Sequence, residues 1–384
     1  MKYMKSFKKR LSLFGTAVLF SLFNILQVSA ETPSAIDIFI DTSSDKKLIS
    51  PYIYGINESA DLSGLKVSSI KQGSSRFSTY NWETNFSNAG SDWFNTNDNA
   101  LVSGYTLKEQ KTPGLAVNSL INTVIQNKIP YAVTTIPMCG YVSADANGPV
   151  LSEQNAPSSR WTPLILKKSE PFSLTPDLTD NAVYADEYIN FILNKYGKAD
   201  SSSGIRGYAL DNDTGEWSLK QPSAHPTENT IEEFLNKSVQ LSKVIKGLDE
   251  KAMVFGGQFK NIDSYYNFNN AQDWSEYSAN SNWFIDSYLS EMKKSSQSHG
   301  KRLIDVLDLY YYSEDTAVSD ILNVTECTNN SHDDCNYQRM QSPRTLWDST
   351  YTENSRISSE FKQYTPLIPT VQASKQIFQR NKAC

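Results

Sequence analysis

The sequence has few of the residues on which metal and nucleotide sites depend. Its 384 residues include only three His, at positions 225, 299 and 332, and they are scattered along the chain. The four Cys, at 139, 327, 335 and 384, show no spacing typical of zinc ligands. No glycine-rich phosphate loop follows a predicted strand, which argues against a nucleotide-binding fold. We therefore predict no metal and no cofactor.

The sequence also lacks an excess of positive charge, since its formal net charge is −6. This balance argues against nucleic acid or an anionic membrane surface as a partner. Cys327 and Cys335 flank the polar loop TNNSHDD, a spacing that permits a disulfide in an oxidising compartment. Aromatic residues, in contrast, are plentiful: 7 Trp, 21 Tyr and 17 Phe suit a protein that stacks on sugar rings, although aromatics also build cores.

The first 30 residues have the features of a secretory signal peptide. Five basic residues within residues 2–10 precede an apolar run, Leu11 to Leu26, and Val28-Ser29-Ala30 offers small residues for cleavage. The alternative is a membrane anchor, but the apolar run is short and Asn24 interrupts it. No further apolar run of membrane length follows. Cleavage would remove five positive charges and take the net charge from −6 to −11. We expect a secreted protein, extracellular or periplasmic, without a membrane partner after cleavage.

Residues 31–384 show no short repeat or low-complexity linker, and instead alternate strand-like and helix-like segments. The predicted strands are 49–56, 76–80, 131–136, 207–210, 252–256 and 304–312. The predicted helices, which have apolar residues at helical spacing, are 114–128, 182–196, 230–248, 283–294 and 367–379. Thr230 and Glu233 form a capping-box pattern. The long segment 139–180 is expected to contain small substructures.

Alternating strands and helices predict parallel βα units. Six units are too few for a closed eight-stranded barrel and too many for one half of a doubly wound fold. Polar and aromatic residues cluster after the strand ends, where a barrel places its active site. A doubly wound sheet remains the alternative from the pattern alone.

The stretch RGYALDNDTGEWSLKQPSAHP, residues 206–226, is the strongest candidate site. An apolar strand, Gly207 to Leu210, runs into Asp211, Asp213 and Glu216, with Trp217 beside them. A carboxylate cluster beside an aromatic at a strand end is typical of barrels that cleave sugars. Glu216 lies three positions after Asp213 and could substitute for it as the acid, and the alternative is a solvated loop carboxylate.

Seven segments resemble glycoside hydrolase family 44, in order along the chain. They are SPYIYGIN (50–57), RFSTYNWETNFSNAGSDW (76–93), MCGYVSADANG (138–148), APSSRW (156–161), PFSLTPDLTDNAVY (171–184), KRLIDVLDLYYYSE (301–314) and RMQSPRTLWDSTY (339–351). The resemblance implies an α/β fold, a (β/α)8 TIM-type barrel that is incomplete here. About six of eight βα units are present, and the last strands and the family's small β-sandwich part are missing.

The same resemblance implies retaining hydrolysis of β-1,4-linked glucans, as in endoglucanases and xyloglucanases. Such hydrolysis uses an acid/base and a nucleophile, both carboxyl groups. The family's acid/base Glu follows an Asp-Asn pair after strand four, and here that position is Asp213. The nucleophile, at the end of strand seven, falls beyond Cys384, so this sequence contains no nucleophile position.

The resemblance also assigns substrate-binding residues. Asn212 matches the Asn that bonds the sugar 2-hydroxyl in related barrels. Tyr80, Trp82 and Trp217 are candidate stacking platforms, with ordinary packing as the alternative for each. Arg76 is expected to order strand-end carboxylates, whereas Asp145 and Glu314 are loop acids without a catalytic assignment.

The chain departs from the family pattern mainly at cleft positions. Besides Asp213, Thr214 replaces a Pro, Gly73-Ser74-Ser75 replaces Gly-Gly-Asn, and residues 310–314 read Tyr-Tyr-Tyr-Ser-Glu instead of His-Trp-Tyr-Pro-Glu. These changes predict an impaired hydrolase or, as the alternative, a non-catalytic carbohydrate-binding protein or a truncated gene product. A barrel without its last strands leaves two open edges, so we also expect a complementing chain or self-association.

Overall fold

The fold is built around a six-stranded parallel sheet. Its strands lie in the order β1 (Gly55–Asn57), β2 (Ser69–Lys71), β5 (Tyr131–Ile136), β10 (Gly207–Leu210), β11 (Met253–Phe259) and β12 (Val306–Leu309). The spatial order therefore follows the chain order, as it does in a (β/α)8 barrel. A doubly wound sheet reverses its strand order at a switch point, so that alternative is wrong.

The computed structural model describes residues 39–379 apart from 45, 47, 59–61, 63, 169 and 315–332. Residues from Ser50 onward group into one structural unit. The predicted signal peptide, Cys327 and Cys384 lie outside the described residues, and so does the side chain of Cys335. Within the described part, no helix combines the length and the apolar character that a membrane crossing requires.

The sheet is rolled about its strand direction. Lys71 on β2 reaches Asp308 on β12 across the concave side, with 2.8 Å between Nζ and Oδ2. Three strands separate β2 from β12 within the sheet, so only a strongly curved sheet can bring these side chains together. The six strands thus form the larger part of a barrel wall, which confirms the predicted incomplete barrel.

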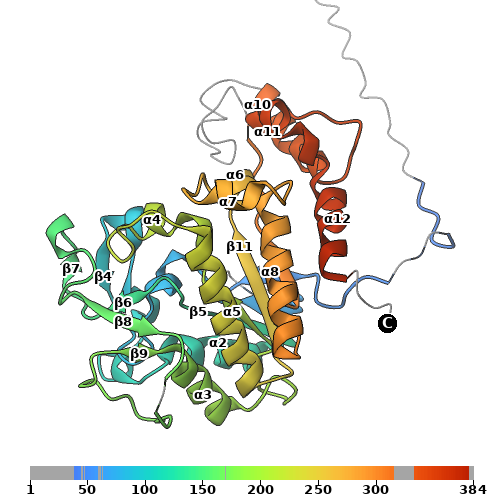
Figure 1. The fold of residues 1–384 in the computed structure, drawn as a ribbon. Coiled ribbons are helices and arrows are strands. Elements are labelled where there is room, and N and C mark those ends of the chain that lie inside the picture. Colours follow the sequence, from blue (N-terminus) through green and yellow to red (C-terminus); the bar gives the residue numbers. More distant parts are fainter. Residues whose placement is uncertain are drawn as a thin grey trace, which may run out of the picture. The chain divides into compact units, whose positions relative to one another are not determined.

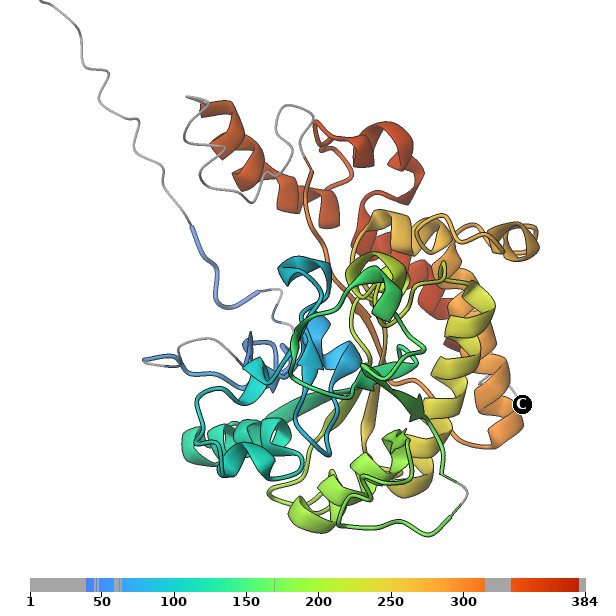
Figure 2. The ribbon, with the colours of Figure 1, turned by 90° about the vertical axis from the view of Figure 1, so that its left-hand side faces the viewer.

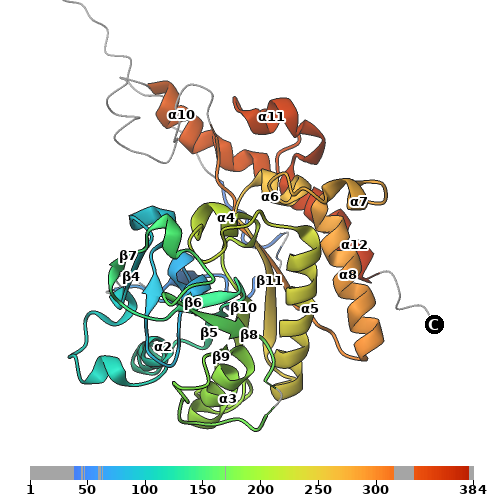
Figure 3. The same cartoon turned by 60° about the vertical axis from the view of Figure 1, so that its left-hand side comes forward.

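Helices cover the convex side of this wall (Figures 1 and 3). They are α2 (Leu115–Asn127), α3 (Ala185–Tyr196), α5 (Ile231–Leu248) and α8 (Phe284–His299), and α12 (Leu367–Gln379) packs against α8. Thr230 begins α5, because its hydroxyl oxygen accepts a hydrogen bond from the backbone N–H of Glu233. The Glu233 carboxylate does not close the predicted reciprocal capping box but accepts from His225 and Lys237 instead. All five predicted helices are confirmed, with shifts at their ends.

Packing between sheet and helices is dominated by aromatic rings. Phe234 on α5 lies 5.6 Å from Phe259 on β11 and 4.8 Å from Phe268, measured between ring centroids. Phe284 on α8 lies 5.3 Å from Phe259. Each of these rings is buried, so each contributes about 2–3 kcal/mol of hydrophobic stabilisation to this layer.

Two predicted strands differ from the structure. Residues 76–79 lie in a 3₁₀ helix, η1 (Ser75–Thr79), which Tyr80 ends, and the second strand is Ser69–Lys71. The backbone N–H groups of Phe77 and Tyr80 donate to the carbonyl groups three residues earlier, those of Ser74 and Phe77, and not to a neighbouring strand. The first strand covers Gly55–Asn57 instead of 49–56, because residues 49–54 are exposed and Pro51 cannot donate to a sheet ladder.

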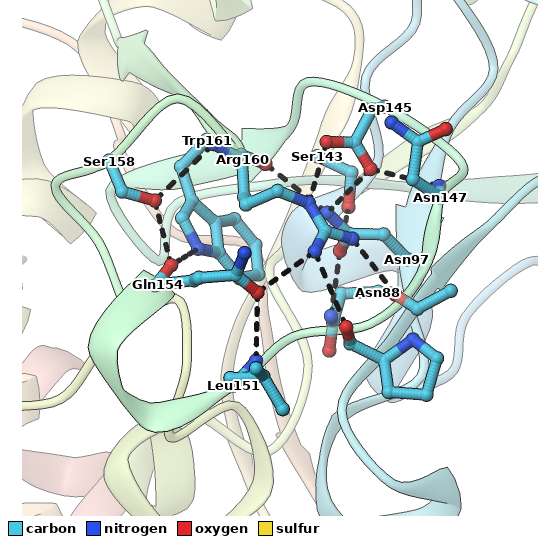
Figure 4. Close-up of polar contacts among 12 residues, drawn as sticks. Asn88, Asn97, Ser143, Asp145, Asn147, Leu151, Gln154, Ser158, Arg160 and Trp161 are labelled. Carbon is cyan, nitrogen blue, oxygen red and sulfur yellow. Dashed lines mark hydrogen bonds and ion pairs between the residues drawn. The ribbon is translucent and has the colours of Figure 1, made fainter.

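Small antiparallel and mixed sheets fill the long segments after η1 and β5. One contains β3 (Ser87–Asn88), β4 (Thr96–Asp98) and β7 (Gly148–Pro149), and the other β6 (Tyr141–Ser143), β8 (Trp161–Ile165) and β9 (Val183–Tyr184). Arg160 organises the first of them (Figure 4): Nε donates to Asp145 Oδ2 over 2.7 Å and Nη2 to the Gly148 carbonyl over 2.9 Å. These sheets confirm the substructure predicted for 139–180 and give Asp145 a structural role.

Short helices complete the fold. Before α5 they are η2 (Gly90–Trp93), η3 (Ala100–Val102), η4 (Glu109–Lys111), η5 (Ser152–Gln154), η6 (Thr214–Glu216) and α4 (Trp217–Lys220). After α5 they are α6 (Ile262–Asn267), α7 (Trp274–Ser278), α10 (Asp333–Gln341), η7 (Ser342–Leu346), α11 (Arg356–Glu360) and η8 (Lys362–Tyr364). Figure 2 shows the helices of residues 333–360 at one end of the sheet, where Arg356 pairs with Asp263 of α6 at 2.7 Å.

Candidate active site

The candidate site begins where β10 ends, at the carboxyl edge of the sheet. Asp211 and Asp213 both have a positive φ, 63° and 47°, which is uncommon for residues other than glycine. Asp211 is fully buried, and its carboxylate accepts hydrogen bonds from the backbone N–H groups of Met138 and Asn212, both at 2.7 Å. Burial raises the pKa of Asp211 to about 6. Asp211 therefore anchors this turn to the end of β5.

Asn212 lies in the interior of the site and is 7% exposed. The hydroxyl of Tyr310, just after β12, donates to Asn212 Oδ1 over 3.5 Å. Asn212 and Tyr310 thus connect the ends of β10 and β12 over the concave side of the sheet. The expected contact of Asn212 with a sugar hydroxyl stays a prediction.

Asp213 is half-buried and carries a free carboxyl group. The Asp213 backbone carbonyl accepts from the Glu216 N–H over 2.8 Å, but no hydrogen-bond donor and no ion-pair partner among the described residues contacts its carboxyl group. Burial raises the pKa of Asp213 above its usual value, and the positive charge of Lys260 partly opposes this effect. A raised pKa favours the protonated form that a general acid needs.

Glu216 is not the solvated loop carboxylate that the sequence suggested. It is 7% exposed, accepts from Asn261 Nδ2 over 2.8 Å, and pairs with Lys260 Nζ at 3.2 Å. Both donors lie directly after β11, so they hold Glu216 against the neighbouring strand end. Glu314 is likewise paired, with Arg356 at 2.9 Å.

A polar cluster that sequence reasoning missed forms the floor beneath Asn212. The Lys71 ammonium donates to Gln258 Oε1 (2.6 Å), Asp308 Oδ2 (2.8 Å) and Tyr310 Oη (2.8 Å). Gln258 reaches this cluster because β11 has a register irregularity between Gly257 and Phe259, with φ of 55° at Gln258. Lys71 and Asp308 are 237 residues apart in the sequence, and no local sequence pattern predicts their contact.

Below this cluster lies a cavity of about 850 Å³ on the concave side of the sheet. Its wall is mainly apolar, with Tyr131, Phe255 and Leu309 among the lining residues. It reaches from β1 to β12, the two edge strands, so the interior of the incomplete barrel is open between them.

The three aromatic residues expected to stack on sugars are in the core. Tyr80, Trp82 and Trp217 are 0%, 1% and 1% exposed. Trp82 stacks on Tyr188 at 5.6 Å, and Trp217 packs against His225 and Phe234. A ring without an exposed face cannot stack on a sugar, so the stacking role expected for these residues is wrong.

Arg76 also differs from its expected position. It lies in η1 and pairs with Asp98 of β4, and it donates to the Ser87 hydroxyl over 3.4 Å. It therefore fastens η1 to the β3–β4–β7 sheet, and the carboxylate that it orders, Asp98, ends β4 and not a strand of the six-stranded sheet.

Comparison with known proteins identifies the family of this chain. The model of glycoside hydrolase family 44 matches residues 86–315. The chain is 42% identical over 355 residues to a beta-mannanase/endoglucanase A from Caldicellulosiruptor saccharolyticus, covering 88% of this chain and 26% of that protein. It is 40% identical over 342 residues to endoglucanase A from Paenibacillus lautus, covering 88% of this chain and 48% of that protein. The chain thus spans about a quarter to a half of these relatives.

A solved structure agrees with the fold. The Paenibacillus polymyxa xyloglucanase of family 44, determined with xyloglucan, superposes with a TM-score of 0.81 at 42% sequence identity. The match covers 86% of this chain and 64% of that one. The family match over residues 86–315, the identity to these relatives and the shared fold show that the chain belongs to glycoside hydrolase family 44.

Proposed function

We propose that the chain is a secreted, β-glucan-directed member of family 44 whose hydrolytic step is impaired at Asp213. The observation that carries this proposal is the free, half-buried carboxyl group of Asp213 at the end of β10. The resemblance assigns the acid/base to this position. The endoglucanase and xyloglucanase names of the relatives support a β-1,4-linked glucan or xyloglucan as the substrate class.

The chemistry of Asp213 fits a weak acid/base. As a protonated acid it would give its proton to the glycosidic oxygen, and as a carboxylate it would later take a proton from water. The Asp arm is one carbon, about 1.5 Å, shorter than the Glu arm of the family. A displacement of about 1 Å costs on the order of 100-fold in rate. We therefore expect catalysis to be slowed strongly, while the position keeps the right chemical group.

Glu216 does not take over this role. Its carboxylate is occupied by Asn261 and Lys260, and these two partners direct it toward the end of β11. Freeing Glu216 would break a partly buried charge pair, which costs free energy before any chemistry begins.

The nucleophile comes from a further segment of polypeptide in this proposal. The resemblance places it on the strand after α12, outside the 384 residues. That strand would pair with the open edge of β12 and cover the cavity between β12 and β1. In this proposal, hydrolysis uses that strand together with the residues described above.

Reducing-sugar release from carboxymethylcellulose and xyloglucan tests the proposal. The full chain is combined with the complementing segment of the Paenibacillus polymyxa xyloglucanase, with Asp213→Asn as the matched variant. We expect slow hydrolysis that Asp213→Asn removes. Hydrolysis at the same rate in both proteins would contradict the role of Asp213.

A second candidate function is glucan binding without hydrolysis. It is favoured by the pairing of Glu216, which leaves Asp213 as the only free carboxylate of the turn 211–216. Calorimetry with cello-oligosaccharides separates the two candidates. Binding that persists in a complemented chain without detectable hydrolysis would favour the second.

Secretion belongs to the same proposal and rests on the signal-like residues 1–30. N-terminal sequencing of the protein from the culture medium or periplasm should find a start just after Ala30. Retention of residues 1–30 on a cytoplasmic protein would contradict it.

A further inference from the structure

Another cavity lies among the helices on the convex side of the sheet, away from Asp213. α5 lies between α3 and α8 and packs against both (Figures 1 and 3). The cavity, of about 460 Å³, is lined by the carboxyl-terminal half of α5, by the start of α3 with the loop before it, and by His299 at the end of α8. Leu248 ends α5 and the chain enters β11 at Met253, so the cavity is near the amino ends of the strands, whereas Asp213 follows the carboxyl end of β10.

One face of α5 forms the floor of this cavity. Gln240, Lys243, Val244, Gly247 and Leu248 line it, and their spacing of three and four residues places them on one side of the helix. Val244 and Leu248, which also contact the core, give the floor its apolar part. Glycine is unfavourable inside a helix, but Gly247 leaves the floor open. A methyl group at Gly247 would meet no atom of the described residues within 4 Å.

The loop before α3 forms a side wall that is held in place by hydrogen bonds. The backbone N–H of Lys168 donates to Asp186 Oδ2 over 2.7 Å, and that of Ser173 donates to Glu187 Oε1 over 2.5 Å. The Lys168 ammonium also pairs with Glu187 at 2.9 Å. These bonds fix the position of Phe172, which lines the cavity and is 39% exposed. The wall is therefore formed before a ligand arrives, which limits the entropy lost on binding.

The positive charge at the cavity is unpaired. Lys167 and Lys243 line the cavity and are exposed, and neither has a hydrogen-bond or ion-pair partner among the described residues. The carboxylate of Asp186 also lines the cavity, but its two oxygens accept from the backbone N–H groups of Lys168 and Glu187. An apolar floor beside two unpaired ammonium groups is complementary to a ligand that combines an apolar body with a negative charge.

We propose that this cavity binds a small amphiphilic carboxylate. The aryl or alkyl body of the ligand covers Val244, Leu248 and Phe172, and its carboxylate group lies near Lys167 and Lys243. The volume is within the range of about 300–1,000 Å³ that is typical of small-molecule sites. The site is independent of the proposed function, because the residues that line this cavity differ from those around Asp213.

Calorimetry on the full chain with 4-phenylbutyrate tests the site. The matched probes are 4-phenyl-1-butanol and 4-phenylbutylamine, which have the same body without the negative charge. We expect 4-phenylbutyrate to bind with a Kd on the order of 1 mM, the alcohol about threefold more weakly and the amine at least about tenfold more weakly. Equal binding of acid and amine would refute the proposal, and so would no binding of the acid up to about 10 mM.

Gly247→Leu tests the location of the site. The new side chain occupies the open space above the floor, so binding of 4-phenylbutyrate should be lost. Folding should be retained, because leucine favours a helix more than glycine does. Gly104→Leu is the matched control: Gly104 lies in the turn after η3, and it also has open space around it. The control should bind like the unmodified chain, whereas unchanged binding by Gly247→Leu would contradict this location.

The lysine variants test the role of charge. Lys167→Met and Lys243→Met should each weaken binding of the acid about threefold, and the double variant about tenfold, because each exposed ion pair contributes little. Binding of the alcohol should not change. Lys294→Met, which removes an exposed lysine of α8 outside the cavity, is the control. A double variant that binds the acid like this control would overturn the proposal, and this comparison decides the matter if Gly247→Leu fails to fold.

Discussion

Replacing Lys71 by Met should destabilise the folded chain strongly. The change removes an ammonium group that donates to Gln258, Asp308 and Tyr310, and it leaves the Asp308 carboxylate without its ion-pair partner. Breaking a buried pair from one side costs about 3–5 kcal/mol. The Lys71 and Asp308 side chains are 20% and 19% exposed, so contact with water reduces the cost of leaving Asp308 unpaired. We expect the free energy of unfolding to fall by about 2–3 kcal/mol.

Urea unfolding followed by tryptophan fluorescence measures this change. The double variant Lys71→Met, Asp308→Leu should recover at least half of the loss, because no unpaired charge remains. Lys294→Met is the surface control: Lys294 is 80% exposed and lies 3.6 Å from Glu291. It should stay within about 0.5 kcal/mol of the unmodified chain. A Lys71→Met variant as stable as this control would refute the view that Lys71 holds β2, β11 and β12 together.

Segments with a strong local signal could be predicted from the sequence. Gly207–Leu210 is a fully buried run bounded by polar residues, and the structure has a strand with these bounds. Leu367–Gln379 has apolar residues at helical spacing, and it is a helix with these bounds. The strand Ser69–Lys71 was missed because three residues are too few to show an alternation.

The site could be predicted only in part. The resemblance located Asp213 at a strand end, but neither pattern nor motif distinguishes a buried Trp82 or Trp217 from an exposed Trp93. All three lie in polar, aromatic-rich segments, and only tertiary packing decides which ring faces water. The pairing of Glu216 with Lys260 depends on β10 and β11 lying side by side, and that of Lys71 with Asp308 on the curvature of the sheet.

Two further predictions concern the start of α5. Thr230→Ala removes the acceptor for the Glu233 N–H, so unfolding in urea should show a loss of about 1 kcal/mol, and a loss below about 0.3 kcal/mol would contradict the cap. Burial raises the pKa of Glu233, but hydrogen bonds and charges from His225 and Lys237 outweigh it and lower the pKa to about 2. The stabilisation by Glu233 is therefore complete above about pH 4.5 and is lost as the pH falls toward 2. In thermal unfolding, Glu233→Gln should be less stable than the unmodified chain at pH 7, and the difference in stability should become smaller below pH 4. A difference that does not change with pH would contradict this role of the Glu233 carboxylate.

The central claim is that Asp213 occupies the acid/base position with an arm one carbon too short. The most direct measurement is the hydrolysis rate of the complemented chain on xyloglucan before and after Asp213→Glu, with Asp213→Asn as the inactive reference. Lengthening the side chain by one carbon should raise the rate by on the order of 100-fold, because it moves the carboxyl group about 1.5 Å closer to the glycosidic oxygen. A rate for Asp213→Glu equal to that of the unmodified chain or of Asp213→Asn would contradict the claim.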